Sequence, residues 1–378
     1  MISTGCRQLL GPAAEGGNVF LAWRDLLFAK GRFVLVGVVI ALIALLTTLL
    51  SGLANGLVDD GISGLRSLPL THLAFQPGAK DSFTRSSLDE TNLKPWHDLE
   101  GAEASALGVS FFNARTPSNS TIDLALFGVP KDSFLVPEGE ARDSLAGPPG
   151  LVLSSEFKDE GLKVGDKLTI VGPDLVLPIL GFTYTGSYGH VEIAFTSLSE
   201  WQQLLYGNDA RGRFSAVAIK APEGTDFAAT DRAADTETST KVAAYSGSPG
   251  FSEEQGTMSL IRAFLLAISA LIVGAFFTVW TVQRTRQIGL MKALGASNTY
   301  ILRDALGQLA VILVVSTAAG ALLATLAGQF VGPKAPFSLH AGPVITSSLL
   351  LIVLGMIGSL VAIRRVTTVD PIIAMGAE

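Results

Sequence analysis

Charged residues are scarce in this sequence. Only 16% of its 378 residues are charged, whereas soluble globular domains contain about 25%, and the mean hydropathy is +0.45. The deficit is concentrated in four apolar stretches, of which only the second contains a charged residue, Arg262: residues 33–57, 258–282, 305–331 and 343–363. Each is longer than the roughly 18 residues that indicate a bilayer-spanning helix. The sequence therefore predicts four transmembrane helices and argues against a cytosolic enzyme.

These spans divide the chain in a one-plus-three order, with a large domain between the first and second spans. We expect a cytoplasmic N-terminus with an amphipathic helix on the inner membrane surface, residues 1–32, and an extracytoplasmic domain, residues 58–257. A cytoplasmic segment (283–304) and an outer loop (332–342) would connect the last three spans, and a cytoplasmic tail (364–378) would follow them.

Basic residues next to the spans predict the orientation, because Lys and Arg are retained on the cytoplasmic side. They occur before the first span, between the second and third, and after the fourth, whereas the link between the third and fourth spans has one, Lys334. Most of the 33 acidic residues lie in 58–257. We therefore expect a multi-pass protein of the plasma membrane with both termini in the cytoplasm. An acidic outer domain also argues against nucleic acid as a partner.

Cysteine and histidine are rare as well. The single Cys6 precedes the first span, so the outer domain has no disulfide, and His72, His97, His190 and His340 are isolated from one another in the sequence. The chain also lacks a zinc-protease His-Glu-x-x-His pattern, a Gly-x-Ser-x-Gly nucleophile motif and a Gly-x-x-x-x-Gly-Lys-Ser/Thr phosphate loop. We interpret the histidines as hydrogen-bonded or solvated side chains. We expect no enzyme activity, no intrinsic metal site and no intrinsic cofactor.

The outer domain is predicted to have mixed α and β structure. A helix is expected from Ser197 to Gly207, because Ser197 and Glu200 fit a capping box. Residues 225–239 are interpreted as a weaker helix or a loop. Short apolar or alternating runs bounded by Gly, Pro and Asp are typical of strands, and they occur at 151–153, 167–171, 175–182, 191–195 and 215–220.

The segment after the second span has the pattern of a short amphipathic helix. Ile288, Met291 and Leu294 recur every three residues, Gly295 is a typical helix stop, and Ser297 fits the cap of the next helix. Two interpretations are open. The helix could lie on lipid headgroups, or it could dock into a groove of a cytoplasmic partner and transmit force.

The run R-T-R-Q-I-G-L-M-K-A-L-G-A-S, residues 284–297, resembles the signature that follows the second span in FtsX-like, MacB-type permeases of ABC transporters. The span order, G-L-K-V-G-D at 161–166 and V-D-P at 369–371 are also similar to that family, whereas Gln283 and Gln287 stand where glutamates are common. The resemblance implies a homodimer that works with two copies of a separate ATPase, which binds ATP and Mg²⁺. It also implies that the segment contains ATPase-coupling residues: Arg284, Arg286, Ile288, Met291, Lys292, Leu294 and Gly295.

The N-terminal third resembles a narrower group, the haem-exporting permeases of Gram-positive bacteria, through A-K-G-R-F at 29–33 and L-L-S-G-L-A-N-G-L at 49–57. This resemblance implies haem as the transported ligand. Arg262 then suits a haem propionate, and Met258 and Glu254, on the same helical face, suit the iron. Glu253 and Asn55 complete the candidate substrate residues. The alternative is an interfacial Arg262 that pairs with Glu or Asp.

Small residues in the first two spans predict close helix contacts. The positions concerned are Thr48, Gly52, Asn55 and Gly56 in the first span, and Ala267 and Gly274 in the second. We expect them to form the seam between two copies of the chain, embedded in membrane lipid. Packing within one chain is the alternative.

Three functions are compatible with this architecture. The chain could export haem, it could be a MacB-type exporter of another amphipathic compound, or it could be a transmembrane signal transmitter that controls a cell-wall hydrolase or a sensor. An exporter requires a substrate-sized opening between the first two spans near the outer leaflet. A transmitter requires an apolar partner patch on the outer domain. The resemblance favours the exporter.

Overall fold

The computed structural model describes residues 30–283, 289–292, 294–331 and 337–366. The chain divides into two compact units, of which one is residues 57–257 and the other contains the rest. Helices α2 (Lys30–Ser67) and α9 (Phe251–Gln283) contribute residues to both units. The amphipathic helix expected within 1–32 lies almost entirely outside the described residues.

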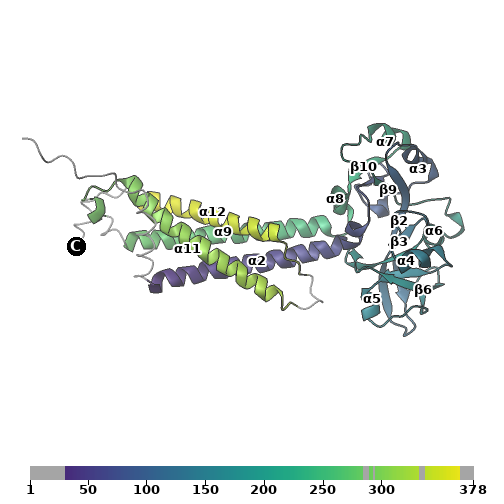
Figure 1. The fold of residues 1–378 in the computed structure, drawn as a ribbon, viewed down its shortest axis with the longest axis horizontal. Coiled ribbons are helices and arrows are strands. Elements are labelled where there is room, and N and C mark those ends of the chain that lie inside the picture. The colour runs from purple at the N-terminus through teal and green to yellow at the C-terminus, as the bar shows by residue number, and fades with distance from the viewer. Residues whose placement is uncertain (1–29, 284–288, 293, 332–336, 367–378) are drawn as a thin grey trace, which may run out of the picture. The chain divides into compact units, whose positions relative to one another are not determined.

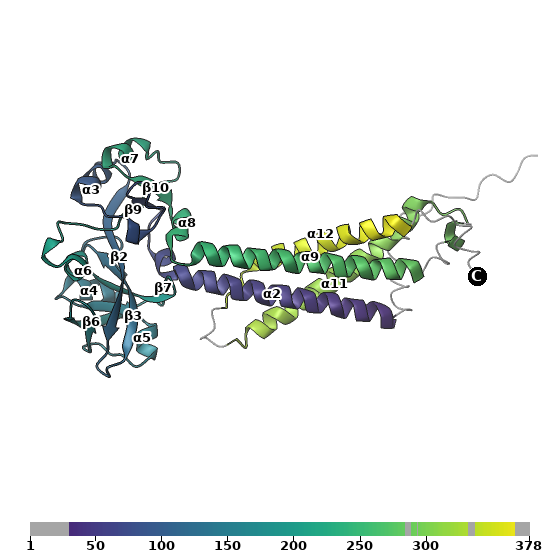
Figure 2. The same cartoon turned by 180° about the vertical axis from the view of Figure 1, so that it is seen from behind.

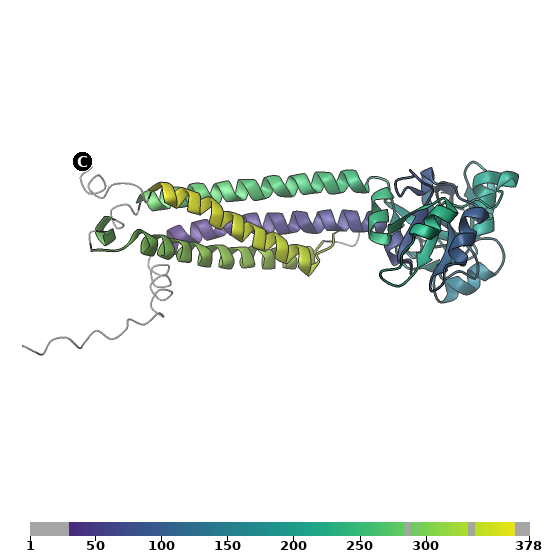
Figure 3. The ribbon, with the colours of Figure 1, turned by 90° about the horizontal axis from the view of Figure 1, so that it is seen from above.

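The first unit is a bundle of long helices (Figure 1). Besides α2 and α9 it contains α11 (Asn298–Gly328) and α12 (Ala341–Val366), and each of the four helices is long and apolar enough to cross a membrane. Helices α2 and α9 run side by side in all three views (Figures 1, 2 and 3), and α11 crosses them at an angle in Figures 1 and 2. Large apolar side chains such as Leu42 and Leu271 point outward, as expected of helices solvated by lipid. The predicted one-plus-three arrangement of membrane helices is confirmed.

Small residues allow these helices to approach one another closely. A Cβ atom added to Gly320 of α11 would collide with the carbonyl oxygen of Ala41 in α2, and one added to Gly358 of α12 would lie 2.7 Å from the carbonyl oxygen of Ala270 in α9. Lipid tails are as apolar as the helices, so this close packing, rather than the exclusion of water, stabilises the bundle.

The second unit contains a ten-stranded sheet, part of which closes on itself. The C-terminal half of β2 (Glu103–Arg115) pairs with β3 (Thr121–Val129), and pairing continues through β8 (Val191–Ser197), β4 (Leu151–Ser154), β6 (Leu175–Thr183) and β5 (Lys167–Ile170) back to β2. The N-terminal half of β2 pairs with β9 (Ala216–Lys220), which leads to β1 (His72–Phe75) and β10 (Glu237–Thr240). Strand β7 (Ser187–Tyr188) forms a hairpin with β8. Strand β2 therefore belongs both to a closed ring and to an open sheet.

Alternate side chains of the ring enter two different cores. Leu126 of β3 joins one buried cluster and Phe127 joins the other. On one face, Gly108 of β2 is paired directly with Gly128 of β3, and the side chain of Trp201 covers both, so that an added Cβ at either glycine would collide with it. The two glycines are therefore required by the fully buried indole that lies on them.

Short helices complete this unit. Helix α6 (Leu198–Tyr206) is the predicted capping-box helix, since Ser197 accepts a hydrogen bond from the Glu200 N–H and the Glu200 side chain accepts one from the Ser197 N–H. The segment 225–239 forms α7 (Ala228–Ala234) and most of β10. The mixed α/β class is confirmed. The remaining elements are η1 (Phe83–Arg85), α3 (Glu90–His97), α4 (Glu140–Ala146), α5 (Glu156–Asp159), η2 (Gly207–Asp209), α8 (Lys241–Ala244) and η3 (Tyr245–Gly247).

Candidate functional site

Arg262 of α9 is hydrogen-bonded to α2. One of its Nη atoms donates to Oδ1 of Asn55 at 2.9 Å and, with a longer separation of 3.4 Å, to the carbonyl oxygen of Ser51. Within the described residues Arg262 forms no ion pair. The partner that it has in the structure is therefore an asparagine and not the Asp or Glu of the alternative prediction. No acidic side chain among the described residues therefore offsets the guanidinium charge, and charged groups in an apolar bundle are costly and usually functional.

Three buried polar atoms surround this contact without a hydrogen-bond partner among the described residues. They are Nε of Arg262, Nδ2 of Asn55 and Oγ of Ser51. Two of them are N–H donors, and the third is a hydroxyl that can donate. An unsatisfied buried polar group costs about 1–3 kcal/mol, so each of the three atoms needs a partner that the described residues do not supply. The structure thus brings together two of the predicted substrate residues, Asn55 and Arg262.

The other predicted substrate residues are divided between the two units. Met258 lies one helical turn from Arg262 in α9 and is partly buried. Glu253 and Glu254 belong to the α/β unit, where Glu253 is exposed and Glu254 accepts a hydrogen bond from His190. The donor group in the bundle therefore consists of Ser51, Asn55 and Arg262, with Met258 on the same helix as Arg262.

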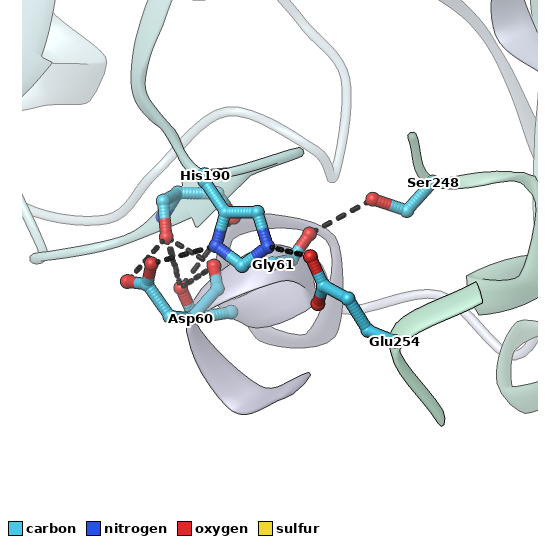
Figure 4. A network of polar contacts seen from close by, with 7 residues as sticks. Asp60, Gly61, His190, Ser248 and Glu254 are labelled. Atoms are coloured by element: carbon cyan, nitrogen blue, oxygen red, sulfur yellow. Dashed lines mark hydrogen bonds and ion pairs between the residues drawn. The ribbon is translucent and has the colours of Figure 1, made fainter. Parts of the chain in front are cut away.

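His190 lies between two carboxylates in the α/β unit (Figure 4). Its Nδ1 is 3.0 Å from Oδ2 of Asp60, in the C-terminal part of α2, and its Nε2 is 2.9 Å from Oε1 of Glu254 in α9. An ionised carboxylate only accepts hydrogen bonds, so the imidazolium form, in which both ring nitrogens donate, can satisfy both carboxylates at once. Burial acts to lower the pKa of His190, but the hydrogen bonds and charges of Asp60 and Glu254 outweigh it. The pKa of His190 is therefore raised above its ordinary value.

The turn that carries His190 fixes the position of the ring. Gly189 and His190 connect β7 to β8 and both have positive φ, 59° and 61°, as in a two-residue type I′ hairpin turn. The Gly189 N–H donates to the carbonyl oxygen of Gly61 at 2.9 Å, and the same oxygen accepts from Ser248 Oγ at 2.9 Å. The imidazole lies over Gly61, where an added Cβ would be 3.4 Å from the ring (Figure 4). The hairpin tip is thus docked on the last turns of α2.

Gly52, at the centre of the predicted dimer seam, is covered by its own chain. A Cβ added to Gly52 would lie 2.6 Å from the ring of Phe337, and the Gly52 carbonyl oxygen accepts a hydrogen bond from the Ser338 N–H at 3.0 Å. This contact is the within-chain packing that the sequence left open. A leucine at Gly52 would therefore disturb one subunit directly and would not isolate a contact between subunits.

The remaining seam positions do not share one free surface. Thr48 and Gly56 of α2 are buried, and Gly274 of α9 is buried against Gly358 of α12. Ala267 is exposed. A dimer through these residues stays a prediction, and it would require either a rearrangement around α2 or a contact that is centred on the exposed side of α9.

The predicted coupling segment is described in part. Arg284, Arg286 and Ile288 lie outside the described residues. Gly295 has a φ of 92°, and the Ala296 N–H donates to the Met291 carbonyl oxygen at 2.9 Å, which is a Schellman-type helix ending. Ser297 Oγ then accepts from the Tyr300 N–H at 3.2 Å and begins α11. The predicted stop at Gly295 and cap at Ser297 are confirmed.

Two leucines form the exposed apolar surface of this segment. Leu294 is 80% exposed, and Leu290, one turn earlier, is 60% exposed. Met291 and Lys292 are partly buried. Leu290 is therefore a functional candidate that the three-residue spacing of Ile288, Met291 and Leu294 did not indicate.

Residues 259–371 match the family model of the FtsX-like permease C-terminal domain. The chain contains an FtsX-like permease C-terminal domain. The matched region begins in α9, includes Arg262, and continues through the Leu290–Leu294 surface and the last two membrane helices. The resemblance inferred from residues 284–297 is thereby confirmed.

Named proteins are similar to nearly the whole chain. A hemin transport system permease protein HrtB of Staphylococcus haemolyticus is 25% identical over 366 residues, which are 94% of this chain and 99% of the relative. An ABC transporter permease of Mycobacterium tuberculosis is 24% identical over 368 residues, 95% of this chain and 99% of the relative. A solved extracellular domain of the ABC-type transporter YknZ from Gram-positive bacteria covers 43% of this chain and 89% of that chain, with 16% identity and a TM-score of 0.32. The two relatives are named as transporter permeases, and this chain is similar to them over nearly its whole length.

Sequence reasoning did not single out His190 of the permease. It treated all four histidines as ordinary hydrogen-bonded or solvated side chains. Gly189 and His190 between two strands do carry the signal of a tight turn, but the partners Asp60 and Glu254 are far away in the sequence. No local pattern could reveal that the tip of this hairpin meets two helices.

Proposed function

We propose that the permease is the membrane subunit of an ABC exporter that releases an amphipathic anion, haem first of all, on the outer side of the plasma membrane. It works as a homodimer with two copies of a separate ATPase, which binds ATP and Mg²⁺. Two observations support the proposal: the similarity to hemin transport permeases over 94% of the chain, and the donor group around Arg262.

The uncompensated charge of Arg262 is the single observation that carries the substrate proposal. Haem is flat and largely apolar, and its two propionates need cationic or hydrogen-bonding partners. A guanidinium binds a carboxylate through two parallel N–H···O bonds, and the buried Nε of Arg262, which has no hydrogen-bond partner among the described residues, is the donor that we propose for one of them. Asn55 Nδ2 and Ser51 Oγ offer further donors. Met258, one turn along α9, offers a thioether of the kind that haem iron accepts.

ATP-driven motion would reach this group through α9. Closure of the ATPase pair moves the segment that contains Leu290 and Leu294, and that segment follows α9 directly in the chain. A shift of α9 relative to α2 separates Arg262 from Asn55 and changes the donor group. The substrate is then released laterally toward the outer leaflet.

Haem titration of the purified full-length permease in detergent tests the substrate. Arg262→Ala should weaken haem binding by about 10- to 100-fold, because a hydrogen bond to a charged group contributes roughly 1.5–3 kcal/mol. Arg303→Ala, which removes an exposed arginine from α11, is the matched control and should bind as the wild type does. Haem dimethyl ester, which lacks the propionate charges, should bind equally to the wild type and to Arg262→Ala.

Met258→Ala separates the iron from the propionates. If Met258 is an iron ligand, its loss should shift the haem absorbance band, whereas Arg262→Ala should weaken binding with a smaller spectral change. Wild-type affinity and spectra in both variants would reject this site. The absence of any haem band in the wild-type permease would reject haem itself and leave the exporter of another amphipathic compound.

A further inference from the structure

The β7–β8 hairpin contacts α2 and α9 in very different ways. Toward α2 the contact includes a backbone group of the hairpin and closely packed side chains: the Ser187 N–H donates to Ser63 Oγ at 2.8 Å, and Ser187 Oγ donates to Oδ1 of Asp60 at 3.0 Å. A Cβ added to Gly64 of α2 would collide with Ile193 of β8. The hairpin therefore cannot leave α2 without breaking a packed interface.

Toward α9 the contact is made by side chains. Among the described residues, the hydrogen bond that joins α9 to the hairpin is that between His190 and Glu254. Both side chains remain partly accessible, 30% for His190 and 26% for Glu254. Such a bridge can open by rotation of the two side chains while the backbones stay in place. The contact between His190 and Glu254 can therefore open more easily than the contact between the hairpin and α2.

Both helices carry donor residues further along. Helix α2 contains Asn55 as well as Asp60, and helix α9 contains Arg262 as well as Glu254. A continuous helix transmits displacement along its axis. Each of the two helices thus carries one residue of the bridge and one residue of the donor group.

We infer that His190 is a positioning residue for export: it bridges the outer ends of α2 and α9, and its bond to Glu254 opens and closes in each cycle while its α2 side stays fixed. The inference rests on the proposed function, because it assigns the bridge to the same transport cycle. His190 acts through the two helices and does not itself contact the substrate.

Two cysteine pairs test this asymmetry in a Cys6→Ser background. His190→Cys with Glu254→Cys places a removable, short thiol cross-linker across the part of the bridge that is inferred to open. Ser63→Cys with Ser187→Cys places the same cross-linker across the fixed part, where the two Oγ atoms are 3.2 Å apart. The permease is reconstituted in proteoliposomes with the ATPase that copurifies with it, and ATP hydrolysis and haem binding are measured before cross-linking, after cross-linking, and after reduction.

Cross-linking of positions 190 and 254 should lower ATP hydrolysis by roughly tenfold or more, as expected when a required conformational step is blocked, and reduction should restore it. Haem binding should be retained. Cross-linking of positions 63 and 187 should change neither quantity. If the pair at 190 and 254 turns over ATP equally well with and without the cross-link, the inference is overturned.

Single substitutions separate positioning from folding. His190→Ala should continue to hydrolyse ATP but export less haem per ATP, and His190→Gln, which keeps one N–H donor, should recover part of that ratio. An unchanged ratio in a folded His190→Ala would contradict the inference. If the wild type neither binds nor exports haem, but cross-linking of the cysteine pair at positions 190 and 254 still stops ATP hydrolysis, haem is rejected and the bridge remains supported.

Discussion

Gly108 and Gly128 show how one large side chain dictates the identity of its neighbours. The Trp201 side chain occupies the space that a Cβ at either glycine would need. Gly108→Ala should lower the free energy of unfolding of the α/β unit by about 1–3 kcal/mol, the usual cost of overpacking a core. Urea denaturation of the full-length permease in detergent, followed by tryptophan fluorescence, measures this change.

Gly181 of β6 provides the matched control. An added Cβ there would lie 3.4 Å from Ser144 Oγ, which is an ordinary contact distance. Gly181→Ala should therefore be tolerated far better than Gly108→Ala. Equal stability losses in the two variants would show that the loss arises from the strand backbone and not from the indole.

The donor residues illustrate what a sequence can and cannot predict at this scale. Arg262 was predictable because one charge in an apolar stretch is conspicuous, and its spacing from Met258 follows from helix geometry. Glu254 was assigned to the same face, but the structure shows it bonded to His190. The bond between Glu254 and His190 joins residues that are far apart in the sequence. Helix periodicity describes only neighbours within one helix, so it could not predict this bond.

At the scale of elements, the β7–β8 hairpin gives a pH dependence. Its His190 has a pKa above the ordinary value because Asp60 and Glu254 favour the imidazolium. The stability that this histidine contributes is fully present below the unfolded-state pKa of about 6.5 and is lost as the pH rises through the higher, folded-state value. The stability difference between the wild type and His190→Ala should therefore shrink as the pH rises above neutrality.

Urea denaturation of both proteins over a series of pH values measures this trend. The double variant Asp60→Asn, Glu254→Gln is the control, because amides do not favour the imidazolium. In that background, the loss of unfolding free energy caused by His190→Ala should no longer decrease as the pH rises. A stability difference that grows with pH in the wild-type background would contradict the assigned direction of the pKa shift.

The segment between α9 and α11 leads to a second prediction at this scale. Leu290 and Leu294 are an exposed apolar pair one turn apart, which suits insertion into a groove of the ATPase. Leu290→Asp with Leu294→Asp should abolish copurification of the ATPase while membrane insertion is retained. Thr299→Asp introduces the same charge in the exposed first turn of α11, where it is electrostatically favoured, and should leave copurification intact. Normal ATPase binding in the leucine variant would reject this docking surface.

Helices and strands could be predicted from the sequence where one of their faces is apolar and the other is polar. Helix α6 has a capping box and was expected with nearly its observed bounds. Strands β2 and β3 were missed, because most of their residues are buried on both faces and therefore show no alternation of apolar and polar residues. The closure of the ring through β2 and β5 likewise depends on pairings between distant segments, such as Ala114 with Ile170.

For the whole molecule, the span order followed directly from hydropathy, whereas the orientation rests on the positive-inside rule and can be tested with the single native cysteine. In intact cells, a membrane-impermeant maleimide should not label Cys6, and permeabilisation should expose it. In a Cys6→Ser background, Ser118→Cys, at an exposed turn between β2 and β3, should be labelled without permeabilisation. The reverse pattern would invert the topology.

The pairing of β1 with β9 and β10 has a consequence for biogenesis. His72 of β1 lies opposite Ile219 of β9 on one side and Thr240 of β10 on the other. Strand β1 is the first strand of the domain to be synthesised, and it can form all its pairings only after β10, the last strand, has been synthesised. Contacts of such long sequence separation form slowly. In the predicted topology, the sheet cannot be completed until Thr240 has been translocated. Because α9 begins at Phe251, completion of the outer domain then coincides with membrane insertion of the second span.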